Sequence, residues 1–328
     1  MPDRLRQLRA WRPSERALRR AFLGALAMNA IIVVTGGAVR LTASGLGCPT
    51  FPRCTDKSLV VTREMGGHGV IEFSNRMLTF VLSVAVAVAI VTAWRARRRD
   101  LLRLAGLLFL GIVAQALLGG ITVLTGLNPV TVMAHFLLSM ALIAVATLAH
   151  ERTAGEPVPD GGASPVVRAP LLLGGRILVA VVAVTLFLGT VVTGSGPHSG
   201  DRNATHRLPF DLVEVTQLHA DFVFLLLGLT AGLLLALRAT DAPGPLRRRA
   251  AVLAAVVLGQ GAVGYVQYAT DLPVAVVAAH VLGACLVWIA ALRVLLGMRV
   301  RVGRPPVVPA PARLAEGRQP VTPAATGV

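Results

Sequence analysis

Hydrophobic residues in this chain gather into eight runs of about twenty residues, separated by short polar or glycine- and proline-rich segments. A helix of that length crosses a bilayer and satisfies its own backbone hydrogen bonds in lipid. The pattern therefore predicts an all-α integral membrane protein with eight transmembrane helices. The runs cover residues 20–42, 70–93, 101–125, 131–150, 172–193, 212–237, 250–269 and 273–296.

Composition agrees with this class. Of the 328 residues, 55% are hydrophobic and the mean hydropathy is +0.70, which argues against two water-soluble domains. The first run follows several arginines, but it is too long and too poor in a cleavage motif for a removed signal peptide. We therefore expect it to be a span.

The net charge of +16 is concentrated at alternate ends of the spans, mainly in residues 4–20, 95–103, 238–249 and the C-terminal tail. By the positive-inside rule, both termini are predicted to face the cytoplasm, an N-in/C-in topology. The charge then sets orientation and attracts anionic lipid, and no nucleic-acid partner is expected. The loops predicted to face outward are 43–69, 126–130, 194–211 and 270–272.

A glycine- and proline-rich segment, 151–171, divides the chain into two four-span halves, 20–150 and 172–298. It is predicted to be a cytoplasmic linker. Because four is even, both halves enter the membrane in the same orientation, which predicts a parallel repeat of two pseudo-symmetric four-helix bundles. A basic segment, 1–19, precedes them, and 299–328 is expected to be a disordered cytoplasmic tail.

A glutamine stands twenty residues before a histidine at matching places in the two halves, Gln115 before His135 and Gln260 before His280. Each histidine follows a short turn that carries a proline. A neutral imidazole inside a membrane is costly unless it pairs or coordinates something. Two at matching positions indicate a shared ligand role.

The repeat is broken at one position. His219 stands forty-one residues before Gln260, whereas Asn75 stands forty before Gln115. His219 and His280 are thus predicted at similar depth in one bundle, as ligation of a heme iron from both sides requires. The alternative is that these histidines only hydrogen-bond within the core.

The first half holds a second group: His68, Glu72, Asn75 and Arg76, which share or adjoin one helical face. An ionised Glu72 is expensive to bury without a partner. It is expected either to pair with Arg40 or Arg76, or to handle protons beside a reactive center. His68 is either an axial ligand or a loop residue without that role.

Cys48 and Cys54 lie in the first outward loop, and Cys285 lies alone in the last span. On the oxidising side of a membrane, a close pair in a proline-stiffened loop predicts a disulfide. The alternatives are two unbonded cysteines, or a bond with a redox function.

Three segments, 35–49, 71–76 and 189–201 with its Gly-Pro-His-Ser-Gly-Asp ending, resemble the heme A synthase family. The resemblance implies a plasma-membrane enzyme whose C-terminal half holds heme b and whose N-terminal half receives heme O. It implies oxidation of a ring methyl of heme O to the formyl group of heme A, by successive hydroxylations that use O2 and supplied electrons. The product serves the terminal cytochrome oxidase.

Residue by residue, the resemblance makes His219 and His280 the heme b ligands and His135 a heme O ligand, with iron held by all three. Glu72 matches the catalytic acid of a Glu-x-x-His-Arg motif, and Cys48 and Cys54 match outward-loop cysteines. The histidine sites are expected toward the extracytoplasmic side.

The chain departs from the family where many members have histidine, because Asn75 occupies that position. Either His68 replaces the missing ligand, or one side of the substrate iron stays open for oxygen. For His198 and His206, in a loop predicted to face outward, there are two alternatives: contact with a heme propionate, or exposure to solvent.

Two other functions are weighed: an electron-transferring membrane cytochrome b, and a quinone-linked disulfide oxidoreductase. A cytochrome b would not explain the group of polar residues around Glu72. A disulfide oxidoreductase would not explain the histidines at matching positions in the two halves. Expected partners are heme O, O2, an electron donor of unknown identity, a heme O synthase and the lipid bilayer. Whether the chain forms a homo-oligomer is left open.

Overall fold

The computed structural model describes residues 12–154, 163–198, 200 and 206–301, and these residues contain eight long helices. Each helix is long and apolar enough to cross a membrane. The predicted all-α fold with eight spans is confirmed. The helices are α2 (Glu15–Leu41), α3 (Gly66–Arg95), α4 (Arg99–Leu124), α5 (Pro129–Arg152), α6 (Ala169–Ser195), α7 (Leu212–Ala239), α8 (Gly244–Ala269) and α9 (Val274–Gly297).

Polar caps mark the starts of three helices: α2 and α5 begin before their hydrophobic runs, and α7 begins with its run. The Ser14 side chain accepts a hydrogen bond from the Ala17 N–H, and Asp211 accepts one from the Glu214 N–H. Asn128 caps α5 directly before Pro129, a residue suited to a first helical turn. Hydropathy marks the apolar part of each helix, whereas the caps mark its true start.

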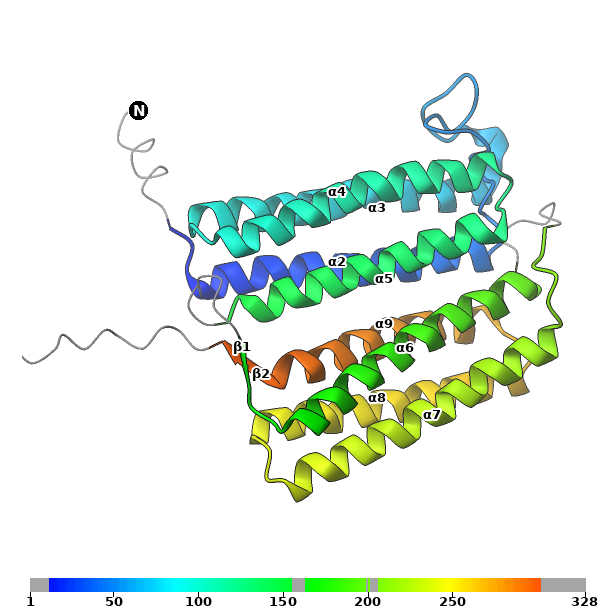
Figure 1. The fold of residues 1–328 in the computed structure, drawn as a ribbon. Helices are drawn as coiled ribbons and strands as arrows, with labels where there is room; N and C mark the ends of the chain where they lie inside the picture. The colour runs from blue at the N-terminus through cyan, green and yellow to red at the C-terminus, as the bar shows by residue number, and fades with distance from the viewer. Residues whose placement is uncertain (1–11, 155–162, 199, 201–205, 302–328) are drawn as a thin grey trace, which may run out of the picture.

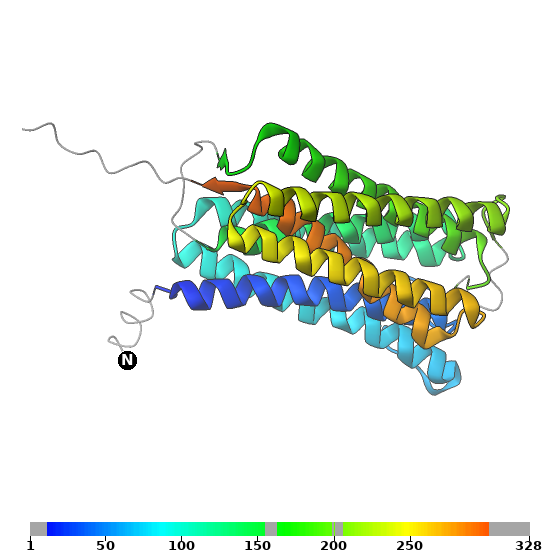
Figure 2. The ribbon, with the colours of Figure 1, turned by 90° about the horizontal axis from the view of Figure 1, so that it is seen from below.

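The first four helices pack as one group and the last four as another, and the two groups lie side by side (Figures 1 and 2). Between the groups, α9 packs on α2 and α5, and α5 also packs on α6. These four inner helices therefore form the contact between the halves. The rotational relation of the halves and the inward orientation of both termini remain predictions.

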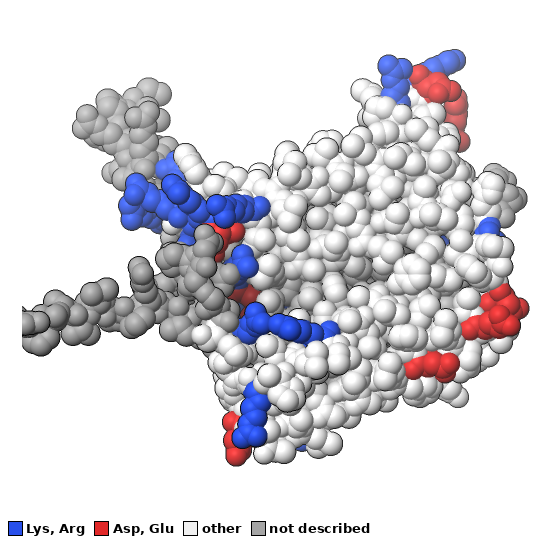
Figure 3. All heavy atoms as spheres, viewed as in Figure 1, with Lys and Arg blue, Asp and Glu red and all other residues white. Residues whose placement is uncertain are grey.

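The surface is divided into a broad uncharged belt and two charged ends, with lysine and arginine gathered at the end where α2 begins (Figure 3). Large apolar side chains that do not line the cavity between the helices are exposed, such as Leu110 at 65% and Leu235 at 63%. Exposure on this scale is costly in water and favourable against lipid acyl chains. The belt therefore fits a multi-pass membrane protein.

The linker and the tail meet in a small sheet. Strand β1 (Ala163–Pro165) pairs antiparallel with β2 (Arg299–Arg301), and Ser164 lies opposite Val300. The expectation of disorder from residue 299 onward is therefore wrong for β2, because its backbone groups find partners in the linker. Residues 302–328 lie outside the described part of the chain.

At the arginine-rich end, one carboxylate joins the two halves. Glu151, at the end of α5, accepts from Arg249 of α8 at 2.6 Å and from Arg293 of α9 at 2.7 Å. Further along the same inner helices, the Trp288 indole N–H donates to the Met140 carbonyl at 2.8 Å. These contacts fix α5 against the second half.

Replacing Glu151 with alanine should loosen this junction. Because Arg293 is 42% exposed and Glu151 is 15% exposed, we expect a moderate loss of about 1–2 kcal/mol, or roughly 2–6 °C in the unfolding midpoint. Cys285 is a buried free thiol and reports unfolding by reaction with a thiol dye. The matched control is Glu64→Ala, which removes an exposed carboxylate. An equal midpoint in the two variants would contradict the predicted role.

Candidate functional site

A cavity of about 1950 Å³ lies between the helices, toward the end opposite the arginine-rich one. All eight helices line it, so it belongs to both halves. Its volume is roughly twice the upper end of the range for a single drug-sized ligand. Its wall is mostly apolar, and the polar side chains that line it include the three histidines singled out in the sequence, His135, His219 and His280.

The spacing of glutamine and histidine in the repeat corresponds to one hydrogen bond between neighbouring helices. The Gln115 side-chain N–H donates to the His135 carbonyl at 3.0 Å, and Gln260 donates to the His280 carbonyl at 2.9 Å. Both bonds use the histidine backbone and leave the ring free. The glutamines therefore position the helix segments from which the rings project.

Each imidazole of the repeat rests against a glycine on the neighbouring helix. A Cβ atom placed on Gly119 would lie 3.2 Å from Cε1 of His135, and one on Gly264 would lie 3.1 Å from Cε1 of His280. Gly189 is placed likewise, at 3.3 Å from His219. Distances this short leave little room for any side chain. The glycines thus allow the three rings to pack closely against the neighbouring helices in the cavity wall.

The three rings have bonding capacity that the protein does not use. Nδ1 of His135, His219 and His280 is buried and forms no hydrogen bond that meets geometric criteria among the described residues, although the Thr185 backbone lies close to the His219 ring. His219 and His280 also lie near one another. Because Cε1 and Nδ1 of each ring lie against a glycine, Nε2 is the ring nitrogen that remains for a ligand in the cavity. This donor set fits heme iron, which takes imidazole nitrogen as an axial ligand.

Asn75 lines the same cavity as His135, and its amide is oriented by Thr35. The Thr35 hydroxyl donates to Oδ1 of Asn75 at 2.8 Å. The Asn75 side chain therefore uses its oxygen to join α3 to α2, and its NH2 group remains a donor. This bond joins residues forty positions apart, and no local pattern of residues predicts it.

His68 lies apart from the cavity. It is exposed, it is absent from the cavity wall, and its Nδ1 lies 2.9 Å from the Ser44 hydroxyl. The structure thus does not bring His68 together with His135. His68 thus lies in the first turn of α3, and its contact with the loop after α2 favours the alternative in which it has no role as an axial ligand.

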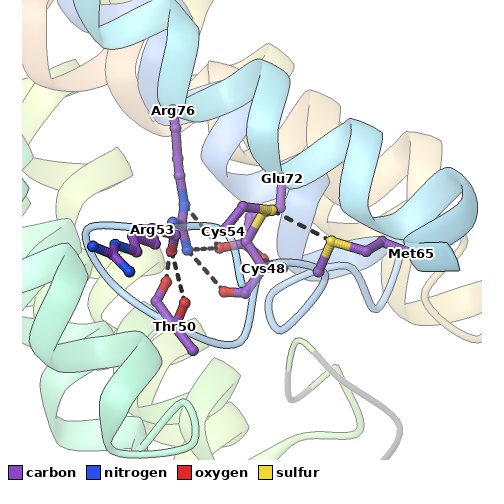
Figure 4. A network of polar contacts seen from close by, with 7 residues as sticks. All are labelled: Cys48, Thr50, Arg53, Cys54, Met65, Glu72 and Arg76. Carbon is purple, nitrogen blue, oxygen red and sulfur yellow. Dashed lines mark hydrogen bonds and ion pairs between the residues drawn. A yellow bond between two sulfur atoms is a disulfide. The ribbon is translucent and has the colours of Figure 1, made fainter. Parts of the chain in front are cut away.

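Glu72 is only 5% exposed and both of its carboxylate oxygens are engaged. Oε1 accepts from Arg76 at 2.6 Å, and Oε2 accepts from the Cys48 backbone N–H at 2.6 Å (Figure 4). Of the two arginines considered as partners, Arg76 is the one that pairs. The buried charge is therefore compensated, and Glu72 still forms part of the cavity wall.

Arg76 extends this contact into the loop that contains the cysteines (Figure 4). Its guanidinium donates to the carbonyls of Cys48, Thr50 and Arg53. Cys48 and Cys54 form a disulfide, as predicted, and both are fully buried. The bond and the Glu72–Arg76 pair together fold the loop against the outer part of α3.

Arg40 lies where α2 reaches the outer end of the cavity, and it crosses to the second half. Its guanidinium donates to the His198 carbonyl at 2.6 Å and to the Thr193 carbonyl at 3.0 Å. His198 also lines the cavity, and its Nε2 lies 3.2 Å from the Leu272 carbonyl, whereas His206 is exposed. The sequence suggested Arg40 only as a partner for Glu72, because contacts between the halves leave no local pattern.

Comparison with known proteins gives a consistent result. A family model described as cytochrome oxidase assembly protein matches residues 19–199. The chain is 33% identical over 131 residues to a protein of Lysinibacillus sphaericus named heme A synthase. This aligned stretch is 39% of this chain and 42% of the relative. A heme A synthase of Bacillus pumilus is 34% identical over 137 residues, 38% of this chain and 43% of the relative. These matches span less than half the length of the relatives.

Proposed function

The chain belongs to the family of cytochrome oxidase assembly proteins, and on that basis we propose that it is a heme A synthase. The observation that carries this proposal is the cavity lined by both halves, whose wall contains three partly buried imidazoles. Two relatives with significant identity are named for this activity. The volume of about 1950 Å³ leaves room for a resident heme and a heme substrate together.

The proposed reaction converts a ring methyl of heme O into a formyl group. Each of two hydroxylations takes one O2, two electrons and two protons, inserts one oxygen atom into a C–H bond and releases one water. The resulting geminal diol then loses a further water, the third in the sequence, to give the aldehyde. Electrons and protons must therefore reach the cavity, and bulk water must be kept from it.

His219 and His280 are the proposed axial ligands of heme b in the C-terminal half. Both line the cavity, both have an unpartnered Nδ1, and each is backed by a glycine. A heme held by two imidazoles is saturated and supplies one-electron transfer. Gln260 keeps the start of α9 in register, so that the His280 ring stays directed at this site.

His135 is the proposed ligand of the substrate heme O in the N-terminal half. The matching position across the repeat is Asn75, whose amide oxygen is held by Thr35. Because His68 lies outside the cavity wall, we propose that no second imidazole binds the substrate iron. Oxygen activation requires such an open position, which a second histidine would fill.

For Glu72 we propose two tasks. As the partner of Arg76 and of the Cys48 N–H, it holds the disulfide loop over the outer side of the cavity. As an acid in the cavity wall, it also takes up protons and passes them to the hydroxylations, which consume them. The disulfide is assigned a structural role, because both sulfur atoms are buried and the loop is held by several hydrogen bonds.

The remaining parts of the proposal concern the surroundings. We place the protein in the plasma membrane with the histidine sites toward the extracytoplasmic side, since arginine gathers at the opposite end. A heme O synthase is the expected source of the substrate. A membrane cytochrome b remains the second candidate, because His219 and His280 alone would serve it.

Pigment analysis of the purified protein tests the function. We expect heme B together with heme O, an alcohol intermediate or heme A, identified as pyridine hemochromes. Replacing His219 or His280 with alanine should remove the heme b signal from reduced-minus-oxidised spectra, because one iron ligand is lost. His135→Ala should keep that signal and lose the second pigment, and the exposed His206→Ala serves as the control. Heme B alone would favour the cytochrome, and no bound heme would contradict both functions.

Two variants separate the proposed tasks of Glu72. Glu72→Gln keeps the length of the side chain and an oxygen for the Cys48 N–H, but it cannot exchange a proton. We expect it to retain heme b and to lose nearly all heme A formation in cells. Glu72→Ala should in addition speed reduction of the Cys48–Cys54 disulfide, measured by a maleimide gel shift. Normal heme A output from Glu72→Gln would exclude the proton-handling role.

Asn75→His tests the open position by supplying the imidazole that the repeat lacks. We expect the substrate heme to become low-spin and the carbon monoxide difference spectrum of the reduced protein to shrink toward background. Heme A formation should fall with it, because O2 and carbon monoxide need the same free position. Asn75→Gln, which keeps the amide, is the control. Undiminished carbon monoxide binding in Asn75→His would contradict an open side at this position.

A further inference from the structure

Arg40 carries a positive charge at the outer end of the shared cavity. It is partly buried, it lines the cavity, and its two hydrogen-bond acceptors are both main-chain carbonyls of the second half. Among the residues that the structure describes, no carboxylate forms an ion pair with it. The two carbonyls orient the guanidinium but leave its charge uncompensated.

The other charged groups of the cavity wall do not neutralise Arg40. Glu72 is engaged by Arg76, and Asp271 is exposed in the turn between α8 and α9. Arg207 lies near enough to add positive potential at Arg40. A cation beside an apolar cavity is costly unless an anion reaches it. The local charge therefore favours an anionic group on whatever occupies the cavity.

We propose that Arg40 is the carboxylate-binding residue of the cavity and pairs with a propionate of a bound porphyrin. This inference rests on the proposed function, because a porphyrin presents a flat apolar body with two carboxylates on one edge. Guanidinium matches carboxylate in a forked geometry, and the pair is stronger in an apolar setting than in water. The macrocycle would then lie among the apolar walls with its acidic edge at the outer end.

The position of Arg40 adds a consequence for assembly. Its hydrogen bonds to the Thr193 and His198 carbonyls already join α2 to the last turn of α6 and to the segment that follows it. Close by, the Gly45 N–H donates to the Gly200 carbonyl at 2.8 Å. A porphyrin carboxylate at Arg40 would therefore be held at a junction of the two halves rather than within one of them.

Titration of the full-length protein from a heme-deficient host tests this, with hemin and hemin dimethyl ester as the two probes. The ester has the same macrocycle and iron but no carboxylates. We expect the wild type to bind hemin more tightly than the ester by about tenfold or more, as for a hydrogen-bonded charged group. Arg40→Gln should lose most of that preference and bind the ester as the wild type does. Arg63→Gln, which removes an exposed outer arginine, should keep the preference.

The outcomes separate this inference from the proposed function. If neither probe binds the wild type, the proposed function fails. If both bind and the hemin-to-ester ratio in Arg40→Gln equals that of the wild type, the inference about Arg40 is wrong while the function stands. Folding is checked by Cys285 labelling, and if the glutamine variant unfolds, the ratio is read from Arg40→Lys, where we expect a drop of about threefold because lysine cannot form the fork. An unchanged ratio there also overturns the inference.

The design also excludes a carboxylate of the chain as the partner. Asp201 follows Gly200 in the sequence and lies outside the described residues. If a chain carboxylate neutralised Arg40, esterifying the probe would not change the effect of Arg40→Gln. A fall of the hemin-to-ester ratio in that variant therefore assigns the contact to the ligand.

Discussion

The structure depends on the cost of placing imidazole rings in an apolar bundle that spans a membrane. Such a ring must be held in place and must have something to bind. The first need is met by the protein: Gln115 and Gln260 bind the carbonyls of His135 and His280, and glycines leave room for the rings. The protein does not meet the second need, since Nδ1 of the three rings forms no hydrogen bond that meets geometric criteria with the described residues. These imidazoles are held in fixed positions but are given no hydrogen-bonding group of the protein to bind. Such an arrangement fits an iron site better than a role in helix packing.

Sequence alone predicted the eight spans and the matched polar residues, because both arise from local rules. A membrane span is fixed by the length of an apolar run, and the glutamine–histidine spacing is fixed by two adjacent helices that meet once. The disulfide was also predictable, since Cys48 and Cys54 are six residues apart in one loop. The sequence left open which arginine pairs with Glu72. Arg76 stands one helical turn further along the same helix, whereas Arg40 could approach Glu72 only through helix packing that no local pattern describes.

Contacts between the halves were beyond reach for the same reason. The pairing of Glu151 with Arg249 and Arg293, and of Arg40 with the His198 carbonyl, joins residues about 100 or more positions apart. They follow from how two bundles dock, and docking is set by the shapes of whole helix faces. His68 shows the converse error: helical spacing placed it with Glu72, but the ring lies at the exposed start of α3, where it contacts Ser44 instead.

The two halves differ at one of the matched ligand positions, Asn75 against His219, and in the proposed function this difference gives each half a distinct chemistry. Two imidazoles on one iron make a carrier of electrons that small molecules do not reach. One imidazole opposite Asn75 makes a site that oxygen reaches, provided the asparagine stays clear of the iron. The Thr35 hydroxyl holds the amide oxygen of Asn75 toward α2, which gives that clearance a physical basis. In the proposed function, one cavity lined by both halves would hold an electron source and an oxidation site, and a histidine present in only one half would distinguish them.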